Sequence, residues 1–223
     1  MNTAIKMCLA LVFACMLQLT YAQSEREQYL QVITERSDKI VAKLGIVDST
    51  TYYATRKTLV QQYDQLNTHH EARAEKIKAL KDAYVGQKDV LETKRTELES
   101  KEDVVLRQIH TGFLAKLGQF LTNEQIDQVK DGMTYGVLPL TYGAYQDMIP
   151  QLTEKQKQQI LIYLTEAREL AMDAPGSKEK HGVFGKYKGR INNYLSKEGY
   201  DLKVEGQKWE ERRSKKQTTN AKS

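Results

Sequence analysis

A chain of 223 residues whose two cysteines both lie within its first 15 positions has no thiols elsewhere for disulfides, thiolate zinc sites or redox centres. The formal net charge of +5 arises mainly at the end of the chain, where residues 203–223 hold seven lysines and arginines against three glutamates. The rest is close to neutral, which argues against a nucleic-acid partner. We therefore expect residues 203–223 to be a basic, disordered, solubilising tail.

The first 22 residues have the pattern of a secretory signal peptide. A lone lysine precedes an apolar stretch, and Thr20-Tyr21-Ala22 places small residues at the −3 and −1 positions of a cleavage site before Gln23. The stretch is too short for a stable membrane span, and no later one is apolar enough. The sequence predicts a periplasmic or secreted protein cleaved near Ala22. Lipidation at Cys15 is the alternative, although bulky Phe13 makes a poor lipoprotein box.

Helical periodicity predicts an all-α, single-domain bundle of about seven helices over residues 23–202. A first helix ends at Gly45, and two long helices over about 48–84 and 87–120 form an antiparallel hairpin with its tip near Gly86. The charged half at 87–103 should project into water, and the tip should be mobile. Shorter helices are expected over about 122–133, 141–150 and 153–172, and from 177 onward.

Two of the shorter helices begin with the same pattern, Leu-Thr-x-x-Gln, at residues 121–125 and 152–156. Each has the chemistry of a capping box, in which the threonine hydroxyl and the glutamine side chain satisfy backbone amides at the helix start. The pair also resembles the LTxxQ repeats of the Spy and CpxP periplasmic chaperones, which are helical hairpin proteins. That resemblance implies a holdase for unfolded clients.

A longer resemblance spans most of the predicted mature chain. It rests on four blocks, at residues 33–40 (ITERSDKI), 70–73 (HEAR), 131–139 (DGMTYGVLP) and 185–195 (GKYKGRINNYL). These blocks are similar to the DUF3826 family of exported bacterial proteins of unknown function. The resemblance implies an exported protein of Gram-negative polysaccharide degraders, often encoded near carbohydrate-active enzymes. It carries over no catalytic residue.

The last of these blocks is a candidate ligand-binding segment. Each glycine inside a helix destabilises it by about 1 kcal/mol relative to alanine, so the glycines of this block need an explanation. One hypothesis is an anion site in which Lys188 and a bidentate Arg190 hold the carboxylate of a uronate. The alternative is tight helix packing at the glycines beside a solvated basic face. The candidate residues of this segment are Lys186, Tyr187, Lys188, Arg190 and Asn193.

Tyrosine is abundant, with 13 residues against 4 phenylalanines. Tyr135, Tyr142 and Tyr145 flank a segment containing glycine and proline, and their rings would suit stacking on sugars with a hydroxyl for hydrogen bonding. Burial of the same rings in the core is the alternative, because helical spacing usually means core.

No motif establishes catalysis. His69-His70-Glu71 begins like a zinc-protease helix, but no histidine stands four residues after His70, where the second ligand would be needed, so His70 is interpreted as a core or interface histidine. The sequence indicates neither a metal site nor a cofactor. Carboxylate pairs for glycoside hydrolysis would have to come from residues whose separations a sequence does not reveal, namely Asp131, Asp147, Glu166 and Asp173.

The leading hypothesis is a non-enzymatic periplasmic accessory protein of polysaccharide utilisation that binds an acidic oligosaccharide or a partner protein. A Spy-like holdase is the first alternative, and an uncharacterised carbohydrate-active enzyme is the second.

Overall fold

The computed structural model describes residues 23 and 25–220, with side chains through residue 215. All regular secondary structure in these residues is helical, which confirms the predicted all-α class. The predicted signal peptide lies outside the described residues. None of the described helices combines the length and the apolar character needed to cross a membrane.

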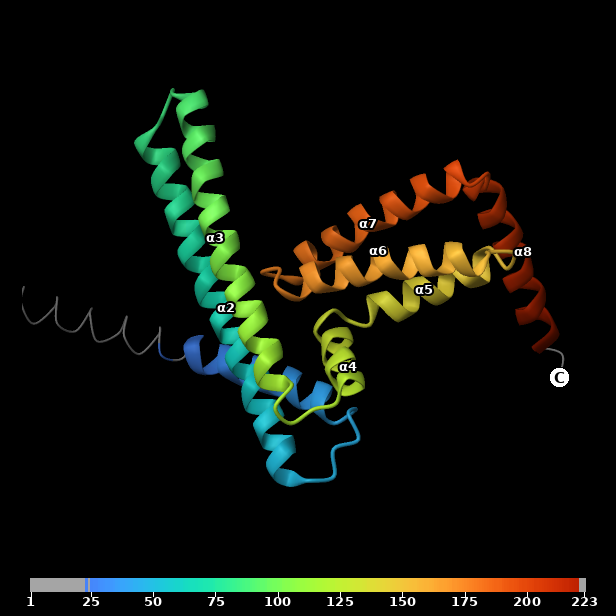
Figure 1. Cartoon of the computed structure of the whole chain (residues 1–223), viewed down its shortest axis with the longest axis horizontal. Coiled ribbons are helices and arrows are strands. Elements are labelled where there is room, and N and C mark those ends of the chain that lie inside the picture. Colours follow the sequence, from blue (N-terminus) through green and yellow to red (C-terminus); the bar gives the residue numbers. More distant parts are fainter. Residues whose placement is uncertain (1–22, 24, 221–223) are drawn as a thin grey trace, which may run out of the picture.

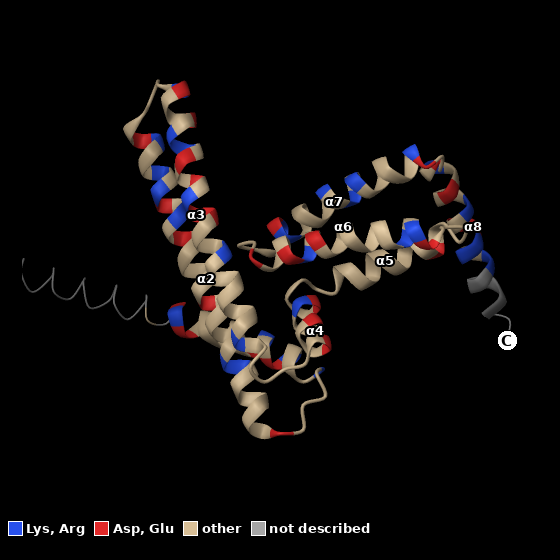
Figure 2. Ribbon diagram, in the orientation of Figure 1, with Lys and Arg blue, Asp and Glu red and all other residues tan. Residues whose placement is uncertain are grey.

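Helices α2 (Ser49–Ala83) and α3 (Lys88–Leu117) form the predicted long antiparallel hairpin (Figure 1). Asp48 caps α2 by accepting a hydrogen bond of 2.7 Å from the Thr51 amide. Gly86, with φ +79°, supplies the left-handed residue that the tip requires. Figure 2 shows acidic and basic residues interspersed along the half of the hairpin near this tip, as the sequence predicts.

The N-terminal helix, residues 25–41, and α4 (Asn123–Met133) pack at the base of the hairpin (Figure 1). Apolar side chains from these two helices and from α2 and α3 form one hydrophobic cluster, which includes Ile33, Val41, Leu59, Phe113, Leu117, Val129 and Met133. The hairpin is therefore anchored at its base, while its outer half extends away from the core.

The second arm consists of α5 (Val137–Met148), α6 (Glu154–Met172), α7 (Ser177–Lys197) and α8 (Leu202–Asn220). Its own hydrophobic cluster includes Ile149, Ile160, Leu164, Phe184, Ile191 and Leu195. Both predicted capping boxes are confirmed: Thr122 and Gln125 cap α4, and Thr153 and Gln156 cap α6, with hydrogen bonds in both directions.

The predicted start of one helix is wrong. Helix α5 begins at Val137 and not at Thr141, because Gly136 in a left-handed conformation turns the chain directly out of α4. Pro139 lies in the first turn of α5, where an amide donor is not needed. The family block at 131–139 is therefore a helix–turn–helix corner.

The predicted disordered tail is instead the helix α8 over most of its length. Asp201 caps it by accepting hydrogen bonds from two backbone amides. Trp209 donates its indole N–H to Asp147 at 2.6 Å, and Arg212 donates to the main-chain oxygens of Asp147 and Met148 at 2.8 and 3.0 Å. These contacts with the end of α5 order a segment whose charge alone predicts solvation.

The hairpin meets the second arm through polar contacts around Asp173, at the end of α6. His70 on α2 contacts the Asp173 main-chain oxygen at 2.7 Å, and His110 on α3 contacts its carboxylate at the same distance. The interpretation of His70 as an interface histidine is thereby confirmed. Lys130 on α4 and His110 both pair with Glu169 on α6, which ties three helices together.

Candidate functional site

A cleft lies where the N-terminal helix, the α4–α5 corner and the α6–α7 turn come together. Its open end has a volume of about 640 Å³ and its narrow end about 250 Å³. Arg36 and Tyr135 line both hollows, so the two hollows adjoin one another at these residues. We call this feature the cationic cleft, because Arg36, Lys39, Lys43 and Lys180 line it.

Three of these cations come from one face of the N-terminal helix. Arg36, Lys39 and Lys43 are spaced i, i+3 and i+7, so they lie along the same side of the helix. All three are exposed, and none forms an ion pair with a carboxylate among the described residues. Asp38, on the same helix, is already paired with Arg56 at 2.7 Å. The open end therefore has an excess of positive charge.

Close packing fixes this face against α4. A Cβ atom on Gly132 would lie 2.9 Å from Cγ1 and 3.0 Å from Cγ2 of Ile40, so only glycine permits this approach. Ile40 is itself buried. The glycine of the DGMTYG block thus sets the distance between the cations of the N-terminal helix and the residues of the α4–α5 corner.

Tyr135 occupies the corner in a strained conformation. Its φ is +60°, in the left-handed region that non-glycine residues avoid at a cost of about 1–2 kcal/mol. Its side chain is 42% exposed and stacks on His181 of α7, with ring centroids 5.6 Å apart and an angle of 14° between the planes. Non-glycine residues with strained backbones are found often at functional sites, which makes Tyr135 a candidate residue.

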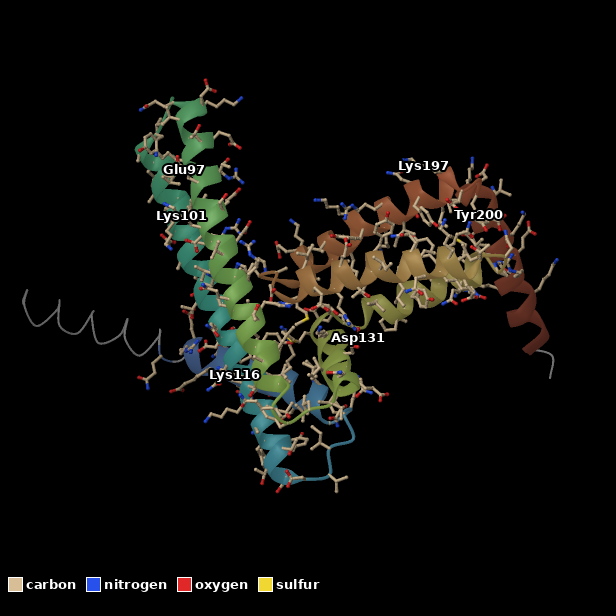
Figure 3. All side chains as sticks on the ribbon, viewed as in Figure 1. Glu97, Lys101, Lys116, Asp131, Lys197 and Tyr200 are labelled. Atoms are coloured by element: carbon tan, nitrogen blue, oxygen red, sulfur yellow. The ribbon has the colours of Figure 1, made fainter. Side chains whose placement is uncertain are left out.

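Asp131 is the acidic residue at the open end, and a buried arginine offsets its charge. Arg168 donates to Asp131 at 2.9 Å and to Asp127 at 2.6 Å. Figure 3 labels Asp131 at the junction between the hairpin and the second arm. Its carboxylate remains able to accept a hydrogen bond from a hydroxyl group, while Arg168 holds its orientation.

The narrow end contains two buried polar groups. Tyr63 is 7% exposed, and its hydroxyl has no hydrogen-bond partner; burial raises the pKa of this phenol. Lys180 is 5% exposed and donates to the Met172 main-chain oxygen at 2.9 Å. Burial lowers the pKa of Lys180 to about 8, against the opposite effect of Asp173. Both residues line the narrow end.

The predicted residues of α7 are not brought together. Lys186 and Asn193 are exposed, and Tyr187 is buried in the second hydrophobic cluster. Arg190 lies over the Tyr187 ring, with its guanidinium carbon 4.8 Å from the centroid, and 3.5 Å from the Glu166 carboxylate. None of the hollows described here is lined by Arg190.

The packing alternative for the glycines of α7 is wrong. A Cβ atom on Gly182, Gly185 or Gly189 would meet nothing within 4 Å. These glycines lie on an exposed helix face and not against another helix.

The three candidate tyrosines lie in different places, and of the three only Tyr135 lines the cationic cleft. Tyr145 is buried in the second arm and donates to Asn192 at 2.6 Å; burial raises its pKa to about 12. Tyr145 and Lys188 line another hollow of about 400 Å³ beside Trp209. Tyr142 is half-buried against the second cluster, as the core alternative predicts.

The four candidate carboxylates have four different partners. Asp131 pairs with Arg168, Asp147 accepts from Trp209, Glu166 lies beside Arg190, and Asp173 accepts from His110. The described residues also contain no cluster of three or more His, Cys, Asp or Glu side chains arranged to hold a metal.

Sequence reasoning missed Arg36, Lys39, Lys43 and Lys180. The first three carry a signal, since three cations share one helix face beside the apolar stripe of Ile33 and Ile40. Lys180 carries none, because nothing in its local sequence predicts that it is buried.

A search of curated proteins finds no significant match to this chain. The family model described as "Protein of unknown function (DUF3826)" matches residues 30–215, which include all the residues of the cationic cleft. The chain therefore belongs to the DUF3826 family.

Proposed function

We propose that this protein is an exported, non-enzymatic accessory protein of polysaccharide utilisation, and that it binds an acidic oligosaccharide in the cationic cleft. The export and the link to polysaccharides rest on the signal-peptide pattern and on the family resemblance. The ligand class rests on the unpaired cations Arg36, Lys39 and Lys43, which are the single observation that carries the proposal.

The geometry of the cleft suits a chain of charged sugars. Three cations within two turns of one helix would contact successive anionic groups of an extended ligand. Tyr135 offers an exposed ring held by stacking on His181, and such a ring can pack on the apolar face of a pyranose. Asp131, fixed by Arg168, would accept a hydrogen bond from a sugar hydroxyl. Charge, aromatic surface and a polar acceptor thus converge in one depression.

The alternatives have less support. A holdase needs a concave apolar surface, whereas the hollow along the hairpin mixes apolar side chains with polar ones, among them Gln61, Gln62 and Gln65. A glycoside hydrolase needs paired carboxylates, and the four candidates lie with separate partners. Binding therefore remains the leading proposal.

The test is isothermal titration calorimetry of the mature protein with tetragalacturonate at low and high salt. Neutral maltotetraose serves as the uncharged comparison. The variant Arg36→Gln/Lys39→Gln/Lys43→Gln should bind tetragalacturonate at least about tenfold more weakly, since each exposed charge contributes on the order of 0.5 kcal/mol. Binding by the unmodified protein should weaken as salt rises.

The matched control is Lys186→Gln/Lys197→Gln/Lys203→Gln, which removes the same charge from exposed positions of α7 and α8. Figure 3 shows Lys197 at the end of α7 far from Asp131. This control and Arg190→Lys should bind like the unmodified protein. If both triple variants lost the same affinity for tetragalacturonate, net charge alone would explain the binding, and a specific site would be refuted. An unmodified protein that binds no acidic glycan would refute the proposed function.

Tyr135→Asn tests the aromatic contribution separately. Asparagine tolerates a left-handed backbone, so this change removes the ring and leaves the corner intact. We expect affinity for tetragalacturonate to fall by about 3- to 10-fold, within the usual range for one aromatic contact. An unchanged affinity, with an unchanged free energy of unfolding, would exclude Tyr135 from the binding surface.

A further inference from the structure

Resting on the proposed function, we infer that the narrow end of the cationic cleft is a subsite for the carboxylate of a single uronate residue, held by Lys180, Arg36 and the Tyr63 hydroxyl. The open end would then hold the rest of the oligosaccharide. The protein would thereby distinguish carboxylated sugars from neutral ones at one defined position.

The Tyr63 hydroxyl is the first observation in favour. It is buried and has no hydrogen-bond partner among the described residues, although buried polar groups are nearly always paired. Tyr63 lines the narrow end together with Arg36 and Tyr135, and both of these residues influence the pKa of its phenol. A ligand oxygen in this hollow would offer the hydroxyl the acceptor that the described residues do not provide.

Lys180 is the second, independent observation. An ammonium has three donors, and the structure records one hydrogen bond, to the Met172 main-chain oxygen. The charged groups that act on it are Asp173, at the end of α6, and Arg36, on the N-terminal helix. The Asp173 carboxylate is already paired with His110, so it does not neutralise Lys180 alone. A buried ammonium of this kind would gain from an anionic partner.

Arg36 is the third residue of the subsite, and it also lines the narrow end. Its guanidinium carbon lies 5.5 Å from the centroid of the Tyr63 ring, and the side chain has no carboxylate partner. A planar guanidinium can grip a carboxylate through two parallel hydrogen bonds. The start of α7 also lines the hollow at Gly176, but Glu179 reaches back beside that residue. We therefore assign the carboxylate to the side chains and not to the helix amides.

The experiment compares trigalacturonate with its methyl ester by calorimetry near pH 7. Lys180→Met should weaken trigalacturonate binding by about 10- to 100-fold, the range for a hydrogen bond to a charged group. Tyr63→Phe should weaken it by about 3- to 10-fold, the range for a neutral donor. The methyl ester should bind poorly to every variant. Matched controls are Lys186→Met on the exposed face of α7 and Tyr142→Phe on the second arm.

A second readout separates recognition from a structural role. If Lys180 meets a carboxylate, binding near pH 8 should be accompanied by proton uptake, because the anion favours the charged amine. Calorimetry in buffers of different ionisation enthalpy measures this uptake, which Lys180→Met should abolish. Lys180→Met should not lower the free energy of unfolding, since methionine replaces a poorly solvated ammonium.

The outcomes distinguish the two proposals. Trigalacturonate binding that depends on Lys39 and Lys43 but is unchanged in both Lys180→Met and Tyr63→Phe would overturn the subsite and leave the proposed function standing. A sulfated oligosaccharide that binds as tightly, with the same dependence on Lys180, would overturn the assignment to carboxylate. An unmodified protein that binds no acidic oligosaccharide would overturn both.

Discussion

The contact between α3 and the end of α6 should make the stability of the protein depend on pH through His110. Its Nδ1 lies 2.7 Å from Oδ2 of Asp173, and its Nε2 lies 3.4 Å from Oε2 of Glu169. These two carboxylates raise the pKa of His110 from 6.5 to about 9, and Asp173 has the larger effect. At neutral pH the ring is thus an imidazolium that donates to both acids.

The sign and size of the effect follow from this pKa. A histidine whose pKa is raised on folding stabilises the folded state fully below about pH 6.5, and the contribution is lost as the pH rises through 9. Each pKa unit corresponds to about 1.4 kcal/mol, so the whole contribution is about 3 kcal/mol for this mostly buried ring. The Lys180 amine, whose pKa of about 8 is lowered by burial, acts oppositely: its contribution makes stability rise with pH between about 8 and 10.5.

The assay therefore uses Lys180→Met as the reference protein, so that the lysine does not contribute. Urea unfolding followed by circular dichroism compares Lys180→Met with Lys180→Met/His110→Gln between pH 6 and pH 10. We expect the difference in unfolding free energy to be about 2–3 kcal/mol larger at pH 6 than at pH 10. A difference that stays constant within about 0.5 kcal/mol would show that His110 is not charged in the folded protein and would refute this reasoning.

Three further predictions concern backbone positions and are tested by the same unfolding measurement. Gly132→Ala should destabilise the protein by about 1–3 kcal/mol, because its Cβ would lie 2.9 Å from Ile40, and an unchanged stability would mean that the N-terminal helix shifts freely. Gly185→Ala should stabilise α7 by about 0.5–1 kcal/mol, since its Cβ meets open space; a loss would revive the packing explanation. Thr122→Ala and Thr153→Ala should each cost about 1 kcal/mol, and serine in either place should restore most of it.

The elements that could be predicted from the sequence are those set by local physics. The hairpin follows from two long apolar stripes separated by Gly86, and the starts of α4 and α6 follow from capping boxes that need only a threonine and the glutamine three residues later. The start of α5 was mispredicted because Gly136, at φ +66°, begins the helix without a side-chain cap. Local rules identify caps more readily than glycine corners.

Helix α8 shows where charge patterns mislead. Seven cations against three acids over residues 203–223 predict solvation and disorder, yet Trp209 and Arg212 bind the end of α5. The amino acids that make these contacts are visible in the sequence, but their partner Asp147 lies 62 residues from Trp209. A single tryptophan in a basic tail is the one local sign that the segment docks.

The candidate site could not be located from the sequence for the same reason, although its composition was partly anticipated. Cations, a tyrosine and glycines were expected in one helix of the family pattern, at residues 185–195. The structure instead takes its cations from residues 36–43 and from Lys180, and its tyrosine from the corner at Tyr135. In the sequence alone, each of these segments has only the pattern of an amphipathic helix or a turn. The cleft forms only when the helices pack together, so no single segment predicts it. The strain at Tyr135 and the unpaired hydroxyl of Tyr63 exist only in the folded chain, and they are the features that point to a ligand.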